Sequence, residues 1–429
     1  MFLYSDGMGR SIAAASLLLA TAGLAAVAAE TERPAVQPWS RWRGAAGAGQ
    51  GGDAAFPHAW AETDWAWSAD LPGRGHASPV VRDGRIYTAS ADEAAGLRFV
   101  TAHDLATGRL VWQRDIAGPI DQHHGQNSSA SGSVVAGPAG VYWMWGTRAG
   151  IHVHAFSAEG TPLWQVGIGP FAGEHGFGGT PAVCDDVLVV PNDQDDTSFV
   201  VGLDVRTGAE RWRRPRQSGK ASYATPLVID RGDGPLVVLA SMAHGLTALD
   251  PATGAVLWER RCLPKRAVSS PIAVGGLIVA TCGDGGGDNT LVALRPPDGR
   301  VAGGAEPAVV YTLDRGVAPY VPTPVASAGR LYLWGDRGVV TCVDAAAGAT
   351  VWRGRVGGNF SASPIALGGT IVNVSQDGEV VTIADGAAFE VLGRVPLGGT
   401  CRSTPAVVGR RMVFRSEGRL HALDAGPSR

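Results

Sequence analysis

The sequence is poor in charge, and lysine is almost absent. Charged residues make up 17% of the 429 residues, the formal net charge is −3, and lysine occurs only at Lys220 and Lys265. No run of basic residues is present. A nucleic-acid-binding surface needs clustered cationic side chains, so we expect no nucleic-acid partner.

Cysteine is also scarce, and its spacing excludes several kinds of site. The five cysteines are Cys184, Cys262, Cys282, Cys342 and Cys401. No two are adjacent and none forms C-x-x-C or C-x-x-C-H, which argues against a zinc site, a dithiol redox motif and a covalently attached haem. One disulfide is possible if the protein is exported. Most of the five cysteines are expected to be buried strand residues.

Long apolar runs are missing beyond the N-terminus. Arg10 precedes the apolar stretch Ile12–Val27, and Ala28-Ala29-Glu30 offers small residues at a cleavage position. This pattern predicts a signal peptide over residues 1–29, with a transmembrane anchor as the alternative and either Met1 or Met8 as the start. No cysteine lies near the cleavage site, so a lipid anchor is not expected. We therefore expect a periplasmic or secreted protein whose mature chain has no transmembrane segment.

What the sequence does contain is a repeat. Eight apolar segments end on a short polar corner, at steps of roughly forty to fifty residues. The clearest copies are Phe99–Asp104, Phe199–Asp204, Leu246–Asp250 and Val339–Asp344, and the weaker ones are Ile151–Ser157, Leu291–Arg295, Val380–Asp385 and Leu420–Asp424. With 61 glycines and 27 prolines for tight turns, the pattern is typical of a β-propeller of four-stranded antiparallel blades.

A Ser/Thr-Pro pair opens each unit where an inner strand would begin, because proline needs no ladder hydrogen bond there. The pairs begin at Ser78, Thr180, Thr225, Ser270, Thr323, Ser363 and Thr404. Between Ser78 and Thr180 there is room for two units, and we interpret Ser131-Gly132 as a degraded copy of the pair. The count is therefore eight blades, with seven as the alternative if the unit around Ser131 is an insertion.

The ends of the repeat predict how the ring closes. The last unit stops after Asp424 without a Trp-bearing strand, whereas Trp65-Ala66-Trp67 stands alone before the first unit. We expect this N-terminal strand to complete the last blade and so remove an open sheet edge. The predicted organisation is a signal peptide (1–29), a lead-in segment (30–58) and one propeller (59–429).

The unit Ala-x-Asp-x-x-Thr-Gly-x-x-x-Trp stands intact at Ala102–Trp112 and Ala248–Trp258, with variants at Gly202–Trp212 and Cys342–Trp352. It resembles the tryptophan-docking repeat of pyrroloquinoline-quinone (PQQ) dehydrogenases. The same repeat occurs in their non-enzymatic relatives, among them the propeller lipoprotein of the outer-membrane β-barrel assembly machinery (BamB-like). The resemblance implies that each tryptophan packs between neighbouring blades. The structural docking residues it predicts are Trp67, Trp112, Trp164, Trp212, Trp258 and Trp352.

The resemblance also implies what a quinoprotein would need. The dehydrogenases have a vicinal Cys-Cys pair under the cofactor, a calcium ion held by Glu and Asn, and a catalytic Asp. This chain has no Cys-Cys pair and offers no segment that matches the calcium and base motif. We therefore expect no cofactor, and PQQ with calcium is the alternative.

Polar loops before the inner strands supply the candidate binding residues. Ring symmetry should gather them at one mouth of the central channel, and these residues are His76, His124, His175, Tyr223, Arg266, Tyr320 and Arg402. The histidines could bind a metal or an anion and would titrate between about pH 5 and 8; the alternative is that they hydrogen-bond loop backbone. Asp193, Asp195 and Asp196 could bind calcium, although they also suit an acidic turn.

Two functions therefore stay open. The favoured prediction is an exported, non-catalytic, monomeric propeller that serves as a binding or assembly scaffold for a protein or polymer. The alternative is a quinoprotein-like oxidoreductase that binds PQQ and calcium in the funnel. No nucleophile–base pair or phosphate loop is visible in the sequence.

Overall fold

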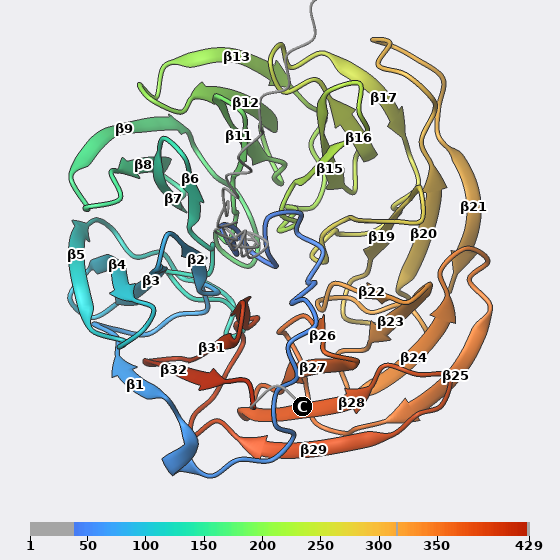
Figure 1. The fold of residues 1–429 in the computed structure, drawn as a ribbon. Helices are drawn as coiled ribbons and strands as arrows, with labels where there is room; N and C mark the ends of the chain where they lie inside the picture. The colour runs from blue at the N-terminus through green and yellow to red at the C-terminus, as the bar shows by residue number, and fades with distance from the viewer. Residues whose placement is uncertain (1–37, 315, 427–429) are drawn as a thin grey trace, which may run out of the picture. The chain divides into compact units, whose positions relative to one another are not determined.

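The computed structural model describes residues 38–314 and 316–426, so the predicted signal peptide lies outside the described part of the chain. The described residues form eight four-stranded antiparallel sheets. They follow one another around a central axis as the blades of a propeller (Figure 1). The predicted eight-bladed fold is confirmed, and the seven-bladed alternative is wrong. No helix in the described ranges is long and apolar enough to cross a bilayer.

The first four blades follow the chain in order. Blade 1 consists of β2 (Val80–Arg82), β3 (Arg85–Asp92), β4 (Leu97–Asp104) and β5 (Leu110–Ala117). Blade 2 consists of β6 (Val135–Gly137), β7 (Gly140–Thr147), β8 (Gly150–Phe156) and β9 (Pro162–Gly169). Blade 3 consists of β10 (Ala182–Cys184), β11 (Val187–Asn192), β12 (Phe199–Asp204) and β13 (Glu210–Pro215). Blade 4 consists of β14 (Leu227–Asp230), β15 (Pro235–Ser241), β16 (Gly245–Leu249) and β17 (Val256–Arg260).

The other four blades complete the ring. Blade 5 consists of β18 (Ile272–Val274), β19 (Leu277–Cys282), β20 (Thr290–Arg295) and β21 (Ala308–Leu313). Blade 6 consists of β22 (Val325–Ser327), β23 (Arg330–Trp334), β24 (Val339–Asp344) and β25 (Thr350–Arg355). Blade 7 consists of β26 (Ile365–Leu367), β27 (Thr370–Val374), β28 (Glu379–Ala384) and β29 (Val391–Pro396). Blade 8 consists of β30 (Ala406–Val408), β31 (Arg411–Ser416), β32 (Arg419–Asp424) and β1 (Trp67–Asp70), which a 3₁₀ turn, η1 (Glu62–Asp64), precedes.

The burial of each strand follows its place in the blade. The second and third strands are buried on both faces, as in β12 and β19, because neighbouring blades cover them. The outermost strands alternate, and β13 and β25 expose every second residue to solvent. Continuous apolar runs in the middle strands and alternation in the outer strand are what these two environments require.

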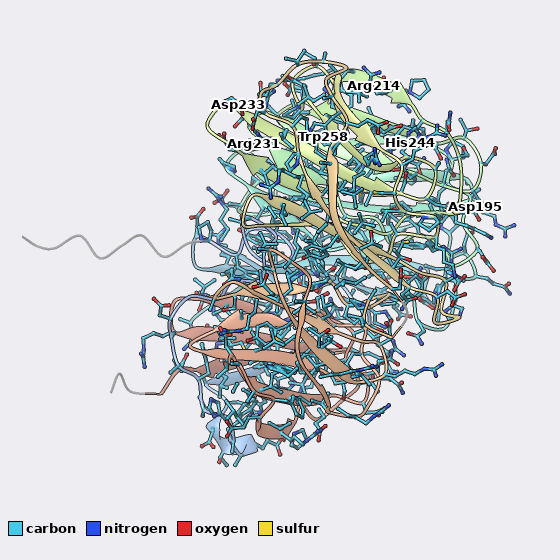
Figure 2. All side chains as sticks on the ribbon, turned by 90° about the vertical axis from the view of Figure 1, so that its right-hand side faces the viewer. Asp195, Arg214, Arg231, Asp233, His244 and Trp258 are labelled. Carbon is cyan, nitrogen blue, oxygen red and sulfur yellow. The ribbon has the colours of Figure 1, made fainter. Side chains whose placement is uncertain are left out.

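The two faces of the ring carry different loops. The mouth face carries the loops that precede each inner strand and the turns between second and third strands, such as Asp195 and His244. The corner face carries the turns after each inner strand, such as Arg231 to Asp233, and the Asp corners. Figure 2 shows Asp195 and His244 toward one side of the molecule and Arg231 and Asp233 toward the other.

The N-terminal strand closes the ring as predicted. Strand β1 pairs antiparallel with β32, with Trp67 opposite Ala422 and Asp70 opposite Arg419. Figure 1 shows the N-terminal β1 beside the C-terminal β32. The two ends of the propeller are thus joined by one sheet, and blade 8 has no unpaired edge on its third strand.

The Asp corners of blades 1, 3, 4 and 6 are turns capped by the Asp side chain. In blade 1 the Asp104 carboxylate accepts hydrogen bonds from the Thr107 amide (2.8 Å) and hydroxyl (2.7 Å), which lower the pKa of Asp104. Gly108 follows with φ +74°, and a Cβ on Gly108 would lie 2.4 Å from the Trp67 ring. Glycine is required there both for the left-handed backbone and for the close approach of the indole.

An indole from each of five outer strands hydrogen-bonds the next blade. Each Nε1–H donates to a backbone carbonyl just past the neighbouring corner, at 2.8 to 3.1 Å. The donor–acceptor pairs are Trp67–Leu105, Trp112–Ala158, Trp164–Val205, Trp212–Pro251 and Trp352–Gly386. Trp112 is buried, and the other four are half-buried. The contact joins two blades through both apolar area and a hydrogen bond.

Three of the interfaces between neighbouring blades, here called seams, depart from this pattern. Trp258 is buried and forms no such bond within the described residues. An insertion after β20 brings Gly303 and Gly304 against the outer edge of blade 4. At the next seam Tyr311 replaces the tryptophan and donates to the Ala345 carbonyl at 2.9 Å. Blade 7 has Gly393 at this position.

The lead-in segment fills the gap beside Gly393. The carbonyl oxygen of His58 lies 1.8 Å from where a Cβ of Gly393 would be. Trp60 and Trp65 pack on Phe414 of blade 8, with ring centroids 6.0 and 5.8 Å from it. The seam between blades 7 and 8 is therefore packed by residues that precede the repeat.

Candidate functional site

The lead-in segment crosses the central channel and closes it. Trp39 forms an antiparallel bridge with Val81 of blade 1, and the Ser40 carbonyl accepts from the Ala136 amide of blade 2 at 2.8 Å. On the opposite side, Gln50 bridges in parallel to Ala366 of blade 7. Figure 1 shows this segment running across the middle of the ring. The channel is therefore not an open pore.

Two buried arginines hold the segment in place. Arg41 donates to the Pro226 carbonyl of blade 4, and Arg43 donates to the Pro324 (2.8 Å) and Pro364 (3.1 Å) carbonyls of blades 6 and 7. Burial lowers the pKa of Arg41 to about 10 and that of Arg43 to about 9. The guanidinium groups bind backbone oxygens instead of a ligand, so they act as a structural clamp.

Above this segment, on the mouth face, lies a funnel-shaped cavity of ≈ 900 Å³. Six of the seven predicted binding residues line it: His76, His124, His175, Tyr223, Tyr320 and Arg402. Arg266 is not among the lining residues, because its side chain is buried and donates to the Glu174 carboxylate at 3.0 Å. The ring thus gathers most of the predicted residues, and their role in binding stays a prediction.

The charged groups near the funnel are largely neutralised by other residues. Glu174 also accepts from Lys220 at 3.2 Å, and Arg402 lies 3.6 Å from Glu417. Asp284 pairs with Lys265 at 2.7 Å. The Asp336 carboxylate accepts from the amides of Tyr320 (2.8 Å) and Val321 (3.0 Å), although burial keeps its pKa raised. Arg266 and Arg402 are consequently not free cations that wait for an anionic ligand.

The three histidines do not form a metal triad. The rings of His124 and His175 are 4.9 Å apart between centroids, but the described residues contain no group of three His, Cys, Asp or Glu placed to hold a metal ion. Burial, with the nearby charges of Arg402 and Arg415, lowers the pKa of His76 to about 3. Burial also lowers the pKa of His175. The prediction that the histidines titrate between about pH 5 and 8 is therefore wrong for His76.

A ring of hydroxyl groups encircles the funnel floor. One Ser or Thr at the start of each inner strand lines the cavity, and the eight are Ser78, Ser133, Thr180, Thr225, Ser270, Thr323, Ser363 and Thr404. Seven of them accept a hydrogen bond of 2.8 to 3.0 Å from the amide of the preceding member. In blade 2 the member is Ser133, not Ser131 as expected. The Ser133 hydroxyl accepts from the Ser78 amide, and the Ser133 amide donates to the Thr180 hydroxyl.

A loop of the mouth face reaches across the funnel. The Gln126 side-chain oxygen accepts from Gln376 at 3.1 Å and from the Ser361 hydroxyl at 3.3 Å, both in blade 7. On the near side, the Asn127 side chain donates to the carbonyls of His175 (2.8 Å) and Phe177 (3.0 Å). The loop from blade 1 to blade 2 thus spans part of the opening.

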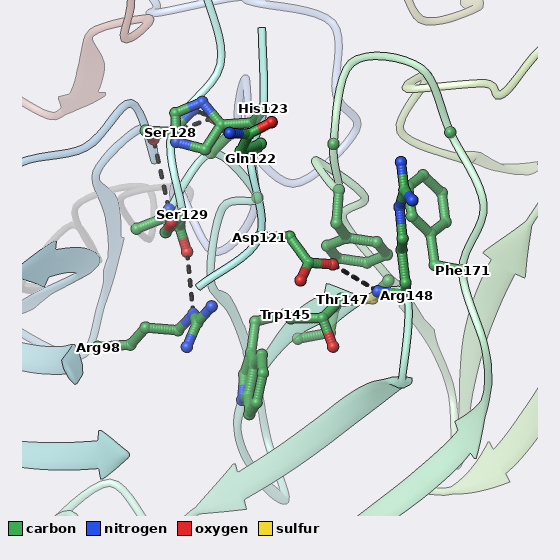
Figure 3. Close-up of a pocket in the computed structure, with 18 of the residues that line it drawn as sticks. Arg98, Asp121, Gln122, His123, Ser128, Ser129, Trp145, Thr147, Arg148 and Phe171 are labelled. Atoms are coloured by element: carbon green, nitrogen blue, oxygen red, sulfur yellow. Dashed lines mark hydrogen bonds between the residues drawn. The ribbon is translucent and has the colours of Figure 1, made fainter. Parts of the chain in front are cut away.

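A second, smaller cavity of ≈ 50 Å³ lies under the same loop (Figure 3). The Arg98 guanidinium stacks over Trp145 at 4.1 Å and donates to the Ser129 carbonyl at 3.3 Å. Asp121 accepts from the Arg148 amide at 2.6 Å. These contacts anchor the ends of the loop. The space is large enough for only one or a few water molecules.

The acidic turn does not offer a calcium site. Asp193 forms a buried ion pair with Arg216 at 2.6 Å, and the Asp195 carboxylate accepts from the Ala221 amide at 2.6 Å. Only Asp196 of the three has no such contact within the described ranges, and calcium needs six to eight oxygen ligands. The calcium hypothesis for Asp193, Asp195 and Asp196 is not supported.

The funnel residues also fit PQQ with calcium poorly. All five cysteines are free thiols and no two are neighbours, so no disulfide can lie beneath a quinone. The carboxylates that line the cavity, Asp284 and Asp336, already bind Lys265 and backbone amides. Both carboxylates thus already have partners in this structure.

Two further histidines make stability depend on pH. Burial lowers the pKa of His154 and of His421 from 6.5 to about 4. His154 Nε2 accepts from the Trp145 indole at 3.0 Å, and His421 Nδ1 bonds Ser68 at 2.9 Å. Between pH about 6.5 and 4 the unfolded chain binds more protons at these positions than the folded chain does. Acidification should therefore destabilise the fold over that range.

We expect the free energy of unfolding to fall as pH decreases from 6.5 to 4, by up to roughly 3 kcal/mol for each of the two groups. Urea titrations at pH 7.5, 6, 5 and 4 would measure it. His154→Gln, which keeps an acceptor for Trp145, should make the decline shallower while leaving the slope above pH 7 unchanged. An equal slope in both proteins would exclude His154 as a contributor.

Sequence reasoning missed Trp42 and Gln126, which both line the funnel. Neither belongs to the repeat, so periodicity could not place them. The hydroxyl ring leaves a signal in the sequence, since every Ser/Thr-Pro pair carries a hydroxyl residue, although the pair by itself predicts only where a strand starts.

Comparisons with known proteins agree with the fold. The family described as outer membrane protein assembly factor BamB matches residues 58–142, 149–306 and 287–427. The crystal structure of BamB from Moraxella catarrhalis is 18% identical, with a TM-score of 0.61 over 84% of this chain and 99% of that chain. The quinohemoprotein alcohol dehydrogenase from Comamonas testosteroni is 15% identical, with a TM-score of 0.64 over 92% of this chain and 81% of that chain.

One curated protein is similar to part of this chain. The quinohemoprotein alcohol dehydrogenase ADH-IIG of Pseudomonas putida is 27% identical over 157 residues, which is 35% of this chain and only 20% of the relative's own length. The structural likenesses, at 18% identity or less, show the fold alone. The family match, by contrast, runs through most of the repeat from residue 58 to residue 427. The chain therefore belongs to the family described as outer membrane protein assembly factor BamB.

Proposed function

We propose that the protein is an exported, non-catalytic β-propeller that serves as a binding or assembly scaffold for a protein or polymer partner. The observation that carries the proposal is the neutralised chemistry of the funnel. Asp284 and Asp336 are held by Lys265 and by backbone amides, and Arg402 lies beside Glu417. Groups that already have partners can contribute to a binding surface without taking part in proton transfer.

The description of the matched family supports an assembly role, since it names an outer membrane protein assembly factor. Export follows from the predicted signal peptide. The rigid ring, with variable loops on its mouth face, supports binding, because loops held by a rigid scaffold are common binding sites.

The alternative is a quinoprotein-like oxidoreductase, which the partial likeness to the quinohemoprotein alcohol dehydrogenase of Pseudomonas putida favours. It requires PQQ and calcium to bind where, among the described residues, no cysteines are vicinal and the two carboxylates that line the funnel already have partners. One experiment separates the two functions.

The purified protein would be titrated with PQQ and Ca²⁺ by calorimetry and assayed with primary alcohols and an electron-accepting dye. In parallel, a photoreactive residue would replace the exposed Arg337 on the mouth face or the exposed Asp83 on the corner face in cells. If the protein is a scaffold, we expect no dye reduction and a defined crosslink from one face only. Turnover that depends on PQQ, without a face-specific crosslink, would refute it.

A further inference from the structure

We propose that the funnel is a saccharide-binding site, with the Trp42 ring as its stacking floor and the Ser/Thr ring as its set of hydrogen-bond donors. The inference rests on the proposed binding function and deepens it by naming the polymer class. It uses residues of this chain that neither the repeat motif nor the family match assigns to a ligand.

The hydroxyl ring supplies donors. In seven of its members the oxygen already accepts an amide hydrogen bond, for example from Ser78 to Ser133 at 3.0 Å and from Thr225 to Ser270 at 2.8 Å. Within residues 38–314 and 316–426, no ring hydroxyl donates its proton to a protein acceptor. All eight line the cavity, so their protons are available to acceptor atoms inside it. A saccharide presents such oxygens all around its ring.

The floor supplies an apolar face. Trp42 lines the cavity and is only half-buried, although its neighbours Arg41 and Arg43 are both buried. The Arg43 guanidinium lies 5.5 Å from the Trp42 ring centre, and Arg43 is itself clamped to the Pro324 and Pro364 carbonyls. An indole fixed at the base of a polar cavity is suited to stack on the C–H face of a sugar, because its π-system is an apolar surface of defined orientation.

The inner walls of the funnel carry few unpaired charges. Burial lowers the pKa of His76 to about 3, which leaves this histidine uncharged at neutral pH, and the carboxylates of Asp284 and Asp336 have partners. Amide groups from Gln126 and Gln376 add neutral donors and acceptors at the mouth. Exposed Arg337 and Arg353 also line the opening, which would allow an acidic sugar there as well as a neutral one. At ≈ 900 Å³ the cavity can hold a few sugar units.

The test is calorimetric titration of the full chain with two probes, maltohexaose and hexagalacturonate, at about 0.15 M salt. We expect at least one to bind with a dissociation constant below about 1 mM. Trp42→Ala should weaken that binding at least tenfold. Thr225→Val should weaken it about fivefold through the loss of one hydrogen bond.

Thr225 is the informative ring position because its hydroxyl accepts none of the seven amide bonds, so Thr225→Val removes a donor without breaking the ring. Thr350→Val, on an outer strand, is the matched control and should bind as the original chain does. Absence of binding to both probes up to roughly 10 mM overturns the proposal, as does unchanged binding in a folded Thr225→Val protein. If Trp42→Ala fails to fold, Thr225→Val decides alone. Because neither PQQ nor a face-specific crosslink enters this titration, its failure is distinguishable from failure of the scaffold function.

Discussion

A chain that begins after Asp70 should lose cooperative folding. The truncation removes β1, which forms the outer strand of blade 8 through its pairing with β32. It also removes Trp60 and Trp65 from the seam over Phe414, and the Arg43 clamp from the channel. The third strand of blade 8 would become an open edge, which favours aggregation. Size-exclusion chromatography and thermal unfolding would show an aggregated or markedly less stable protein.

A chain that begins at residue 38 is the control, since it keeps every contact described above and should unfold like the full chain. A synthetic peptide of residues 58–72, added in trans, should restore part of the lost stability by occupying the vacant edge. Equal melting temperatures for the truncated and control chains would show that the pairing of β1 with β32 does not contribute to the stability of the propeller.

Replacing Trp112 by alanine should cost roughly 3–5 kcal/mol of unfolding free energy. The Trp112 ring is 6% exposed, and its centroid lies 5.9 Å from that of Tyr87 in its own blade and 6.0 Å from that of Phe156 in the next. Its Nε1–H also donates to the Ala158 carbonyl at 2.8 Å. The substitution therefore leaves a cavity and an unpaired carbonyl at one seam. Denaturant titration would measure the loss.

Leu110→Ala is the matched control on the same strand, because Leu110 is 44% exposed and its truncation should change stability by less than about 0.5 kcal/mol. Trp112→Phe should fall between the two, since it keeps most of the apolar area and loses the hydrogen bond. A loss for Trp112→Ala no larger than that for Leu110→Ala would refute the structural role of this seam.

The repeat was readable from sequence because each of its parts is enforced locally. The Asp104 corner needs an acceptor for the Thr107 amide, Gly108 needs a positive φ, and the middle strands need continuous apolar residues. These requirements recur in several blades, so a single sequence displays the pattern more than once. The missing outer strand after Asp424 likewise implied the closure by Trp67.

Positions outside the period were decided only by tertiary structure. Tyr311 takes the place of a seam tryptophan, and His58 fills the space beside Gly393, because a neighbouring blade or a distant segment supplies the complementary surface. No local pattern marks such exchanges.

The same division holds for the candidate site. The symmetry of the repeat predicted that His76, His124 and His175 lie at one mouth, because equivalent loops of a ring must share a face, and all three line the funnel. It could not show that Glu174 neutralises Arg266, or that Asp193 is held by Arg216, because these partners lie far apart in sequence. The sequence by itself determined the ring, its closure and the face that carries the polar loops. The charge state and the floor of the funnel were decided only by the folded chain, since they depend on which distant groups meet in the low-dielectric interior.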